Sequence, residues 1–267
     1  MSPAEPGAAG APRLTYIGHG SVLIEMDGVR LLTDPVLRRW IGPLLRRGPL
    51  PGAEATRDLD AVLITHLHPD HLDAASLRLL ASDPLIVVPA DGAAYLRERG
   101  FKHVVGVTRG QEIAVGALLV AATEANHSGR RHSTGGKGEA LGFVVRGERS
   151  IYVAGDTGLF PSMTGLEPDL DVACLPIDGW GPRLPDDHLD PLRAAQALTM
   201  LEPLIAVPIH WGTYYPPALA EVWRGRRTMP PRTFAGHAAR LAPQVEVRVL
   251  EPGEGFEVPP ATRVPGS

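Results

Sequence analysis

The sequence predicts an α+β protein in which two mixed β-sheets pack face to face and helices cover their outer faces. Short apolar, β-branched runs typical of strands recur along the whole chain. Only a few segments have the apolar spacing of a helix, and they do not alternate strictly with the strands. This argues against a parallel doubly wound sheet, although the strand pattern alone also fits other α+β layouts.

Composition narrows the class of protein further. The chain has 267 residues, of which 44% are hydrophobic, so it can bury a large core in one large domain or two small ones. A net charge of −4 argues against a nucleic-acid partner. The single cysteine, Cys174, lies in an apolar run, and we expect a buried, inert thiol there. No signal peptide or membrane-span pattern is found, so we expect a cytoplasmic protein without stable membrane insertion, its oligomeric state left open.

The first elements are expected from residue 13, after an Ala-, Gly- and Pro-rich disordered tail over 1–12. Asp27-Gly28 is typical of a hairpin turn, and Asp34-Pro35 ends the strand that follows it. Residues 36–57 contain five arginines with Pro and Gly, and we interpret them as a long, partly mobile loop near the functional site rather than core. The strands expected in this part are 13–17, 21–26 and 29–33.

The remaining elements are expected within a single domain over 13–258, followed by a tail over 259–267. Asp73 is the expected N-cap of a helix to Ser82, and Asp190 with Pro191 opens a later helix. The other expected helices are 91–99 and 233–241. The other expected strands are 61–65, 85–88, 103–105, 112–115, 118–122, 141–146, 150–154, 171–175, 204–209 and 245–249.

Three histidines and an aspartate lie within six residues in His66-Leu67-His68-Pro69-Asp70-His71, between the strand 61–65 and the helix after it. Imidazole nitrogens and carboxylate oxygens suit Zn²⁺ and related ions, and a catalytic site leaves one position open for water. His66 and His68 can face one ion, while Asp70 and His71, displaced by the turn at Pro69, can face a second. A lone histidine is usually a surface or core residue, but this density argues for a metal site.

Three more candidates follow apolar strands: His127 after 118–122, Asp156 after 150–154 and His210 after 204–209. Each could be structural when taken singly. Strand ends that converge on one rim would bring all of them together, and a carboxylate can bridge two ions because each oxygen can take one. The sequence therefore predicts seven ligands for two metals: His66, His68, Asp70, His71, His127, Asp156 and His210.

The 66–71 motif resembles that of the metallo-β-lactamase-fold hydrolases. The chain is most similar to the branch that holds L-ascorbate-6-phosphate lactonase and N-acyl-phosphatidylethanolamine-hydrolysing phospholipase D. The similarity covers roughly residues 13–217. Its further motifs are Tyr16-Ile17-Gly18-His19-Gly20-Ser21, Asn126-His127-Ser128-Gly129-Arg130, Gly155-Asp156-Thr157-Gly158, His188-Leu189-Asp190-Pro191 and Ile209-His210-Trp211-Gly212-Thr213.

The resemblance implies an αββα sandwich and a division of the ligands. His66, His68 and His127 would hold one metal, and Asp70, His71 and His210 the other, with Asp156 bridging. Asp70 and His188 are the expected catalytic residues, with His188 as an acid or hydrogen-bond donor near the leaving group or oxyanion.

The remaining polar candidates keep two interpretations each. His19 is either a donor that supports a ligand or a structural turn residue. Arg130 and Arg131 could pair with a phosphate or carboxylate, although adjacent arginines in a polar loop are usually only solvated. His103, His132 and His237 are expected at the surface.

The implied function is hydrolysis of an ester-like bond, with a phosphodiester preferred, by a metal-bridging hydroxide. The ions would be zinc by preference, with manganese or iron as alternatives, and the substrate a small or lipid-like molecule. A lactonase acting on a small (phospho)sugar-type lactone is the alternative within this class.

Other classes are a diiron oxidoreductase, an RNA-processing nuclease and a non-catalytic metal-binding scaffold. The first usually has a carboxylate where His68 stands and needs a flavin partner module. The negative net charge argues against the second, and the complete ligand set argues against the third.

Overall fold

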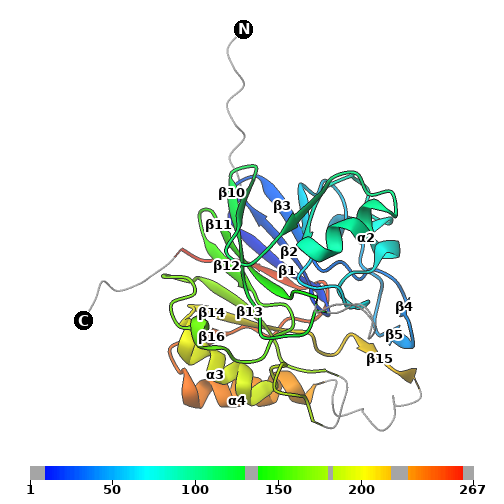
Figure 1. The fold of residues 1–267 in the computed structure, drawn as a ribbon. Helices are drawn as coiled ribbons and strands as arrows, with labels where there is room; N and C mark the ends of the chain where they lie inside the picture. Colours follow the sequence, from blue (N-terminus) through cyan, green and yellow to red (C-terminus); the bar gives the residue numbers. More distant parts are fainter. Residues whose placement is uncertain (1–9, 130–137, 180–182, 218–227, 261–267) are drawn as a thin grey trace.

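The computed structural model describes residues 10–129, 138–179, 183–217 and 228–260. Two seven-stranded mixed sheets pack against each other, with helices on their outer sides (Figure 1). This confirms the predicted αββα sandwich. Residues 1–9 and 261–267, which belong to the two expected tails, lie outside the described part of the chain.

The first sheet is built almost entirely from the N-terminal part of the chain. It is antiparallel from β17 to β3 and parallel from β3 to β8. In spatial order its strands are β17 (Gly255–Glu257), β1 (Arg13–Gly18), β2 (Ser21–Met26), β3 (Val29–Thr33), β6 (Ala61–Leu63), β7 (Leu85–Pro89) and β8 (Val104–Val107).

The second sheet follows in the sequence and repeats this mixture. It is antiparallel from β9 to β12 and parallel from β12 to β16. In spatial order its strands are β16 (Glu246–Val247), β14 (Ile205–Ile209), β13 (Val172–Pro176), β12 (Ser150–Val153), β11 (Leu141–Arg146), β10 (Leu118–Glu124) and β9 (Glu112–Val115).

The main core lies between the sheets, where side chains such as Tyr16, Ile24, Phe143 and Tyr152 are completely buried. Helices α3 (Pro191–Leu201) and α4 (Met229–Leu241) lie together on one side of the molecule, and α2 (Ala93–Arg97) lies on the other with the short α1 (Ala74–Leu77). Among the described residues, no helix is both long and apolar enough to cross a membrane. Because the core and the helices cover the faces of both sheets, the ends of the strands are the parts of the sheets available for a functional site.

Residues 36–57 differ from the predicted mobile loop. They form β4 (Trp40–Ile41), β5 (Leu44–Arg46) and the 3₁₀ turn η1 (Ala53–Ala55), and β5 pairs with β15 (Tyr214–Tyr215) in a third, three-stranded sheet. Arg46 is only 2% exposed, because its guanidinium donates to the carbonyls of Ile17, Val36 and Pro49. The strand partner is about 170 residues away in sequence, so local composition could not indicate it.

Several element boundaries also differ from the prediction. The helix expected over 73–82 ends at Leu77, and two further turns with hydrogen bonds between residues three apart carry the backbone to Leu80. The last helix begins four residues early at Met229, with Pro230 and Pro231 in its first turn. β17 was not predicted, because only three residues pair with β1.

The predicted N-cap of α1 is present and supports a test of stability. Asp73 accepts bonds from the Ser76 backbone N–H at 3.1 Å and from two Arg38 nitrogens at 2.8 and 3.0 Å. Burial opposes ionisation of Asp73, but these donors outweigh it and lower the pKa of the carboxyl. We expect Asp73→Ala to cost roughly 1–2 kcal/mol of stability near pH 7.

The pH dependence follows from the direction of the shift. A lowered pKa stabilises the fold above the ordinary aspartate value of about 4, and this contribution is lost as the pH falls through the lowered pKa. The difference in melting temperature between wild type and Asp73→Ala should therefore narrow as the pH is lowered from 5 toward 3. A difference that stays constant over this range would show that the Asp73 charge is not involved.

Candidate metal centre

Four strand ends meet at one rim of the sandwich. The loop 66–71 follows β6 of the first sheet, while His127, Asp156 and His210 follow β10, β12 and β14 of the second. The structure brings all seven predicted residues into two adjoining clusters. Each cluster thus combines side chains from both sheets.

The first cluster consists of His66, His68, His127 and Asp156. His68 Nδ1 lies 2.9 Å from His66 Nε2 and 3.3 Å from His127 Nε2. Two nitrogens bound to one tetrahedral zinc at about 2.0–2.1 Å lie about 3.3 Å apart. The spacing of the three imidazoles therefore fits a single ion of this size.

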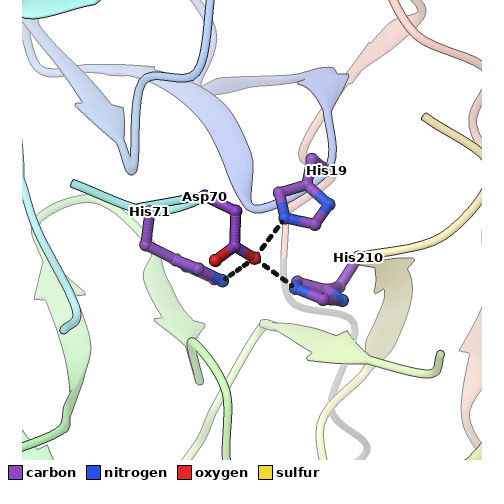
Figure 2. Close-up of side chains that lie close together, drawn as sticks. All are labelled: His19, Asp70, His71 and His210. Atoms are coloured by element: carbon purple, nitrogen blue, oxygen red, sulfur yellow. Dashed lines mark hydrogen bonds and ion pairs between the residues drawn. The ribbon is translucent and has the colours of Figure 1, made fainter. Parts of the chain in front are cut away.

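The second cluster consists of His19, Asp70, His71 and His210 (Figure 2). Asp70 Oδ2 lies at its centre, 3.0 Å from His19 Nε2, 3.5 Å from His71 Nε2 and 3.6 Å from His210 Nε2. His71 Nε2 is a buried atom that has no hydrogen-bond partner in the described part of the chain. A buried ring nitrogen beside carboxylates can donate its lone pair to a cation once its proton is lost, so this donor set fits a metal.

Asp156 lies between the two clusters and is only 5% exposed. Its Oδ2 is 3.9 Å from His66 Nε2 and 3.5 Å from His71 Nε2, while Oδ1 is 3.3 Å from His210 Nε2. The preceding Gly155 has φ +61°, and a Cβ there would lie 2.6 Å from Thr65. The glycine thus allows the end of β12 to approach the loop after β6.

Asp34 supports one imidazole in each cluster, a role that its place in the sequence does not by itself predict. It is completely buried, and it accepts from the Thr65 backbone N–H at 2.8 Å, from Thr65 Oγ1 at 2.6 Å and from His71 Nδ1 at 2.8 Å. An ionised carboxylate only accepts, so His71 carries its proton on Nδ1 and presents Nε2 to the cluster. Thr65 Oγ1 donates its hydrogen bond to Asp34 and accepts one from His66 Nδ1 at 3.1 Å, which likewise leaves His66 Nε2 for the cluster.

The sequence did contain a signal for Asp34. The residue directly follows the strand 29–33, as Asp156 follows its own strand, but Asp34-Pro35 was interpreted only as a strand end. Backbone carbonyls do the same for two further imidazoles: His127 Nδ1 donates to Asp187 O at 3.1 Å and His210 Nδ1 to Asp178 O at 3.0 Å. Such partners orient imidazole ligands in metal sites.

Charge in the site favours a cation. Burial lowers the pKa of His66, His68 and His127, so these rings are neutral near pH 7. At His71 and His210, burial is outweighed by the carboxylates, Asp156 first, and the pKa is raised. In the second cluster, the attraction between the imidazoles and the carboxylates therefore outweighs the effect of burial on the histidine pKa values.

The pKa values of the Asp70 and Asp156 carboxyl groups are lowered, whereas those of His71 and His210 are raised. Burial opposes ionisation of Asp70 and Asp156, but the surrounding imidazoles outweigh it and hold both pKa values well below the usual range. Burial, with the neighbouring His210, lowers the pKa of His19 to about 3. The site therefore presents ionised carboxylates surrounded by imidazoles.

His188 lies at the edge of this centre, with Nε2 3.9 Å from Asp156 Oδ2 and Nδ1 2.9 Å from Asp187 Oδ1. The proposed acid is thus beside the clusters and not inside either of the two that contain the 66–71 residues. Arg130, Arg131 and His132 lie outside the described residues.

The other residues singled out in the sequence lie apart from these contacts. The His103 side chain is 60% exposed beside Asp83, and His237 on α4 contacts Arg240. Burial raises the pKa of the Cys174 thiol, in keeping with an inert core residue.

Fold and donor set together define a metal-dependent hydrolase of the metallo-β-lactamase type. Residues 29–211 match the model of the β-lactamase superfamily domain, and the chain belongs to this superfamily, within the UPF0173 metal-dependent hydrolases. The UPF0173 metal-dependent hydrolase of Methanopyrus kandleri is 34% identical over 251 residues, covering 92% of this chain and 99% of that protein. That of Caldivirga maquilingensis is 32% identical over 251 residues, covering 92% and 98%.

One solved structure of a metallo hydrolase is also similar to this chain in fold and sequence. Igni18, a metallo hydrolase from the hyperthermophilic archaeon Ignicoccus hospitalis, has a TM-score of 0.69 and 29% identity, covering 92% of this chain and 97% of its own. The predicted enzyme class, a metal-dependent hydrolase, is confirmed.

Proposed function

We propose that this hydrolase binds two divalent ions, zinc by preference, and cleaves an ester-like bond, with a phosphodiester favoured over a lactone. The position of Asp156 carries the proposal, because its two oxygens lie within 4 Å of imidazoles in both clusters. His66, His68 and His127 would hold one ion, and Asp70, His71 and His210 the other, with Asp156 shared. No thiolate belongs to either set, which suits zinc but also manganese or iron.

His19 supports the second ion indirectly in this proposal. Its Nε2 faces the acceptor-only carboxylate of Asp70 at 3.0 Å and therefore carries a proton, so it is a hydrogen-bond donor to a ligand. Its backbone is tied to the same strand end, since His210 N donates to His19 O at 2.8 Å. His19 thus holds Asp70 in place for metal binding.

Divalent ions held by these residues would supply a water of lowered pKa as the nucleophile and would polarise the oxygen of the scissile bond. The chain contributes the rest. The strand ends bury most of the ligand side chains, while His68 is half-buried. His188, half-buried at the edge, holds a proton for the leaving group or donates a hydrogen bond to the developing oxyanion.

The phosphodiester preference rests on the segments around His127 and His210, which resemble those of the phospholipase more than those of the lactonase. The test is metal quantification of the purified protein, followed by a panel of chromogenic phosphodiesters and lactones. Less than one metal per chain after expression in metal-replete medium would contradict the dinuclear site. Faster turnover of lactones would reverse the substrate preference.

A diiron oxidoreductase is the alternative from another class. The first cluster has a histidine, His68, where such proteins usually have a carboxylate, and this favours the hydrolase. Iron as the predominant metal, together with reduction of an electron acceptor by the protein, would support the alternative. A protein that holds both metals but turns over no substrate in the panel would instead be a scaffold.

His188→Ala separates the assigned roles. Because His188 is placed on the substrate side, we expect the variant to retain two metals and the wild-type melting temperature, while kcat falls by about 10²–10³-fold. Metal content, melting temperature and turnover are measured on the same preparation. A variant that loses a metal would place His188 among the ligands, and one that loses only stability would make it a packing residue.

A further inference from the structure

We propose that Asp187 is a positioning residue that serves both sides of the reaction centre: its backbone carbonyl orients His127, and its carboxylate orients His188. This inference rests on the proposed function, in which His127 binds a metal and His188 faces the substrate. Neither the sequence motifs nor the family comparison assigns a role to Asp187.

Two contacts carry the inference. His127 Nδ1 donates to the Asp187 carbonyl at 3.1 Å, and His188 Nδ1 donates to Asp187 Oδ1 at 2.9 Å. The His127 and His188 rings lie edge to face, with their centroids 4.6 Å apart. One residue therefore contacts two neighbouring imidazoles: its carbonyl accepts from His127, and its carboxylate accepts from His188 while Oδ2 also lies 3.4 Å from His127 Nδ1.

The loop that carries Asp187 is itself fixed at both ends. Arg193 on α3 donates from Nη1 to the carbonyls of Pro185 at 2.8 Å and His188 at 3.0 Å. On the other side, a Cβ at Gly158 would collide with the carbonyl oxygen of Asp186, so the glycine lets the loop lie directly against the segment after Asp156. The orientation of Asp187 is thus determined by its surroundings.

The hydrogen bond also determines which nitrogen of His188 faces the site. The carboxylate accepts only, so the neutral ring of His188 carries its proton on Nδ1, and Nε2 donates toward a substrate only when the ring takes up a second proton. Nε2 then points to Asp156 Oδ2 at 3.9 Å, too far for a hydrogen bond. Asp187 therefore directs Nε2 of His188 toward the space that a substrate would occupy.

The first test needs no substrate. In zinc-loaded protein with ¹⁵N-labelled histidine, two-dimensional NMR of the imidazoles distinguishes a proton on Nδ1 from one on Nε2, and His188→Ala identifies the signals. We expect the Nδ1–H form of His188 in the wild type, and its loss in Asp187→Ala. A wild-type spectrum with the proton on Nε2, or one that Asp187→Ala leaves unchanged, would overturn the inference.

The second test uses the phosphodiester or lactone identified by the substrate panel. Asp187→Ala keeps the backbone carbonyl for His127, so two zinc ions should remain while kcat falls by about 10–100-fold and KM changes little. Asp187→Asn retains an oxygen acceptor and should restore part of kcat. The control is Asp186→Ala, whose carboxylate is 99% exposed and pairs only at the surface with Arg193; its kcat should stay within about twofold of wild type.

Combining variants separates positioning from loop structure. If Asp187 acts through His188, then Asp187→Ala should cause no further loss of kcat in the His188→Ala background. Losses that multiply would show an independent structural role and contradict the inference. If the wild type turns over no substrate, the proposed function fails, and the NMR result alone then decides the role of Asp187.

Discussion

Asp156→Asn is expected to lose metal and activity together. The amide keeps the size of the side chain but has no charge to set against two cations in a site where Asp156 is 5% exposed. Removing one partner of a buried ion pair costs about 3–5 kcal/mol, which corresponds to metal binding weakened by at least about a hundredfold. The measurement is metal per chain after dialysis against a graded series of chelator concentrations, with turnover assayed on the same samples.

The control for this variant is Asp60→Asn. Asp60 is an exposed aspartate that accepts from the Arg30 backbone N–H, and it belongs to neither cluster. It should keep wild-type metal content. If Asp156→Asn retained two ions at the same chelator concentration as the wild type, Asp156 would not bridge them and the ligand assignment would have to change.

Asp34→Asn is expected to weaken both metal sites, although Asp34 is outside both clusters. The carboxylate accepts hydrogen bonds from Thr65 and His71, whereas an amide nitrogen in its place would donate toward them. The Thr65 hydroxyl would then have to accept from the introduced amide and donate to His66, which puts the His66 proton on the nitrogen that faces the ion. We expect a loss of metal affinity of about 10–100-fold at both sites.

Thr65→Val is the matched variant for this prediction. It removes the hydroxyl that is hydrogen-bonded to both Asp34 and His66 but leaves the Asp34–His71 hydrogen bond in place. Metal titration should therefore show one weakened site in Thr65→Val and two in Asp34→Asn. Equal losses in both variants would show that Asp34 acts through general destabilisation and not through the two separate hydrogen bonds.

The sequence was informative where local pattern and local structure coincide. The strands that end at Thr33, Val153 and Ile209 are mostly apolar, and the polar residues Asp34, Asp156 and His210 that follow them lie at the rim. The loop 66–71 is dense enough in metal-type residues to indicate its chemistry alone. The fold class and the grouping of the seven candidates were accessible from these signals.

The remaining features depend on contacts between distant segments. Arg46 is buried because carbonyls from three separate segments surround its guanidinium, which an arginine in a Pro- and Gly-rich stretch does not reveal. Asp34 and Asp187 support imidazoles 37 and 60 residues away, and neither belongs to a recognisable motif. Such residues act through their position in the folded structure, so a single sequence does not distinguish them from ordinary turn and loop aspartates.

Both sheets contribute side chains to each of the two clusters, and this affects how long the protein survives in the cell. The first sheet comes from residues 13–107 and the second from 112–247, with only β17 returning to the first. Ions held jointly by the two sheets would oppose their separation, by about 4 kcal/mol when free metal exceeds its dissociation constant a thousandfold. Proteases attack opened chains, so starvation for metal would speed turnover of the protein. A cell short of metal would then contain fewer copies of this hydrolase, in addition to a larger inactive fraction.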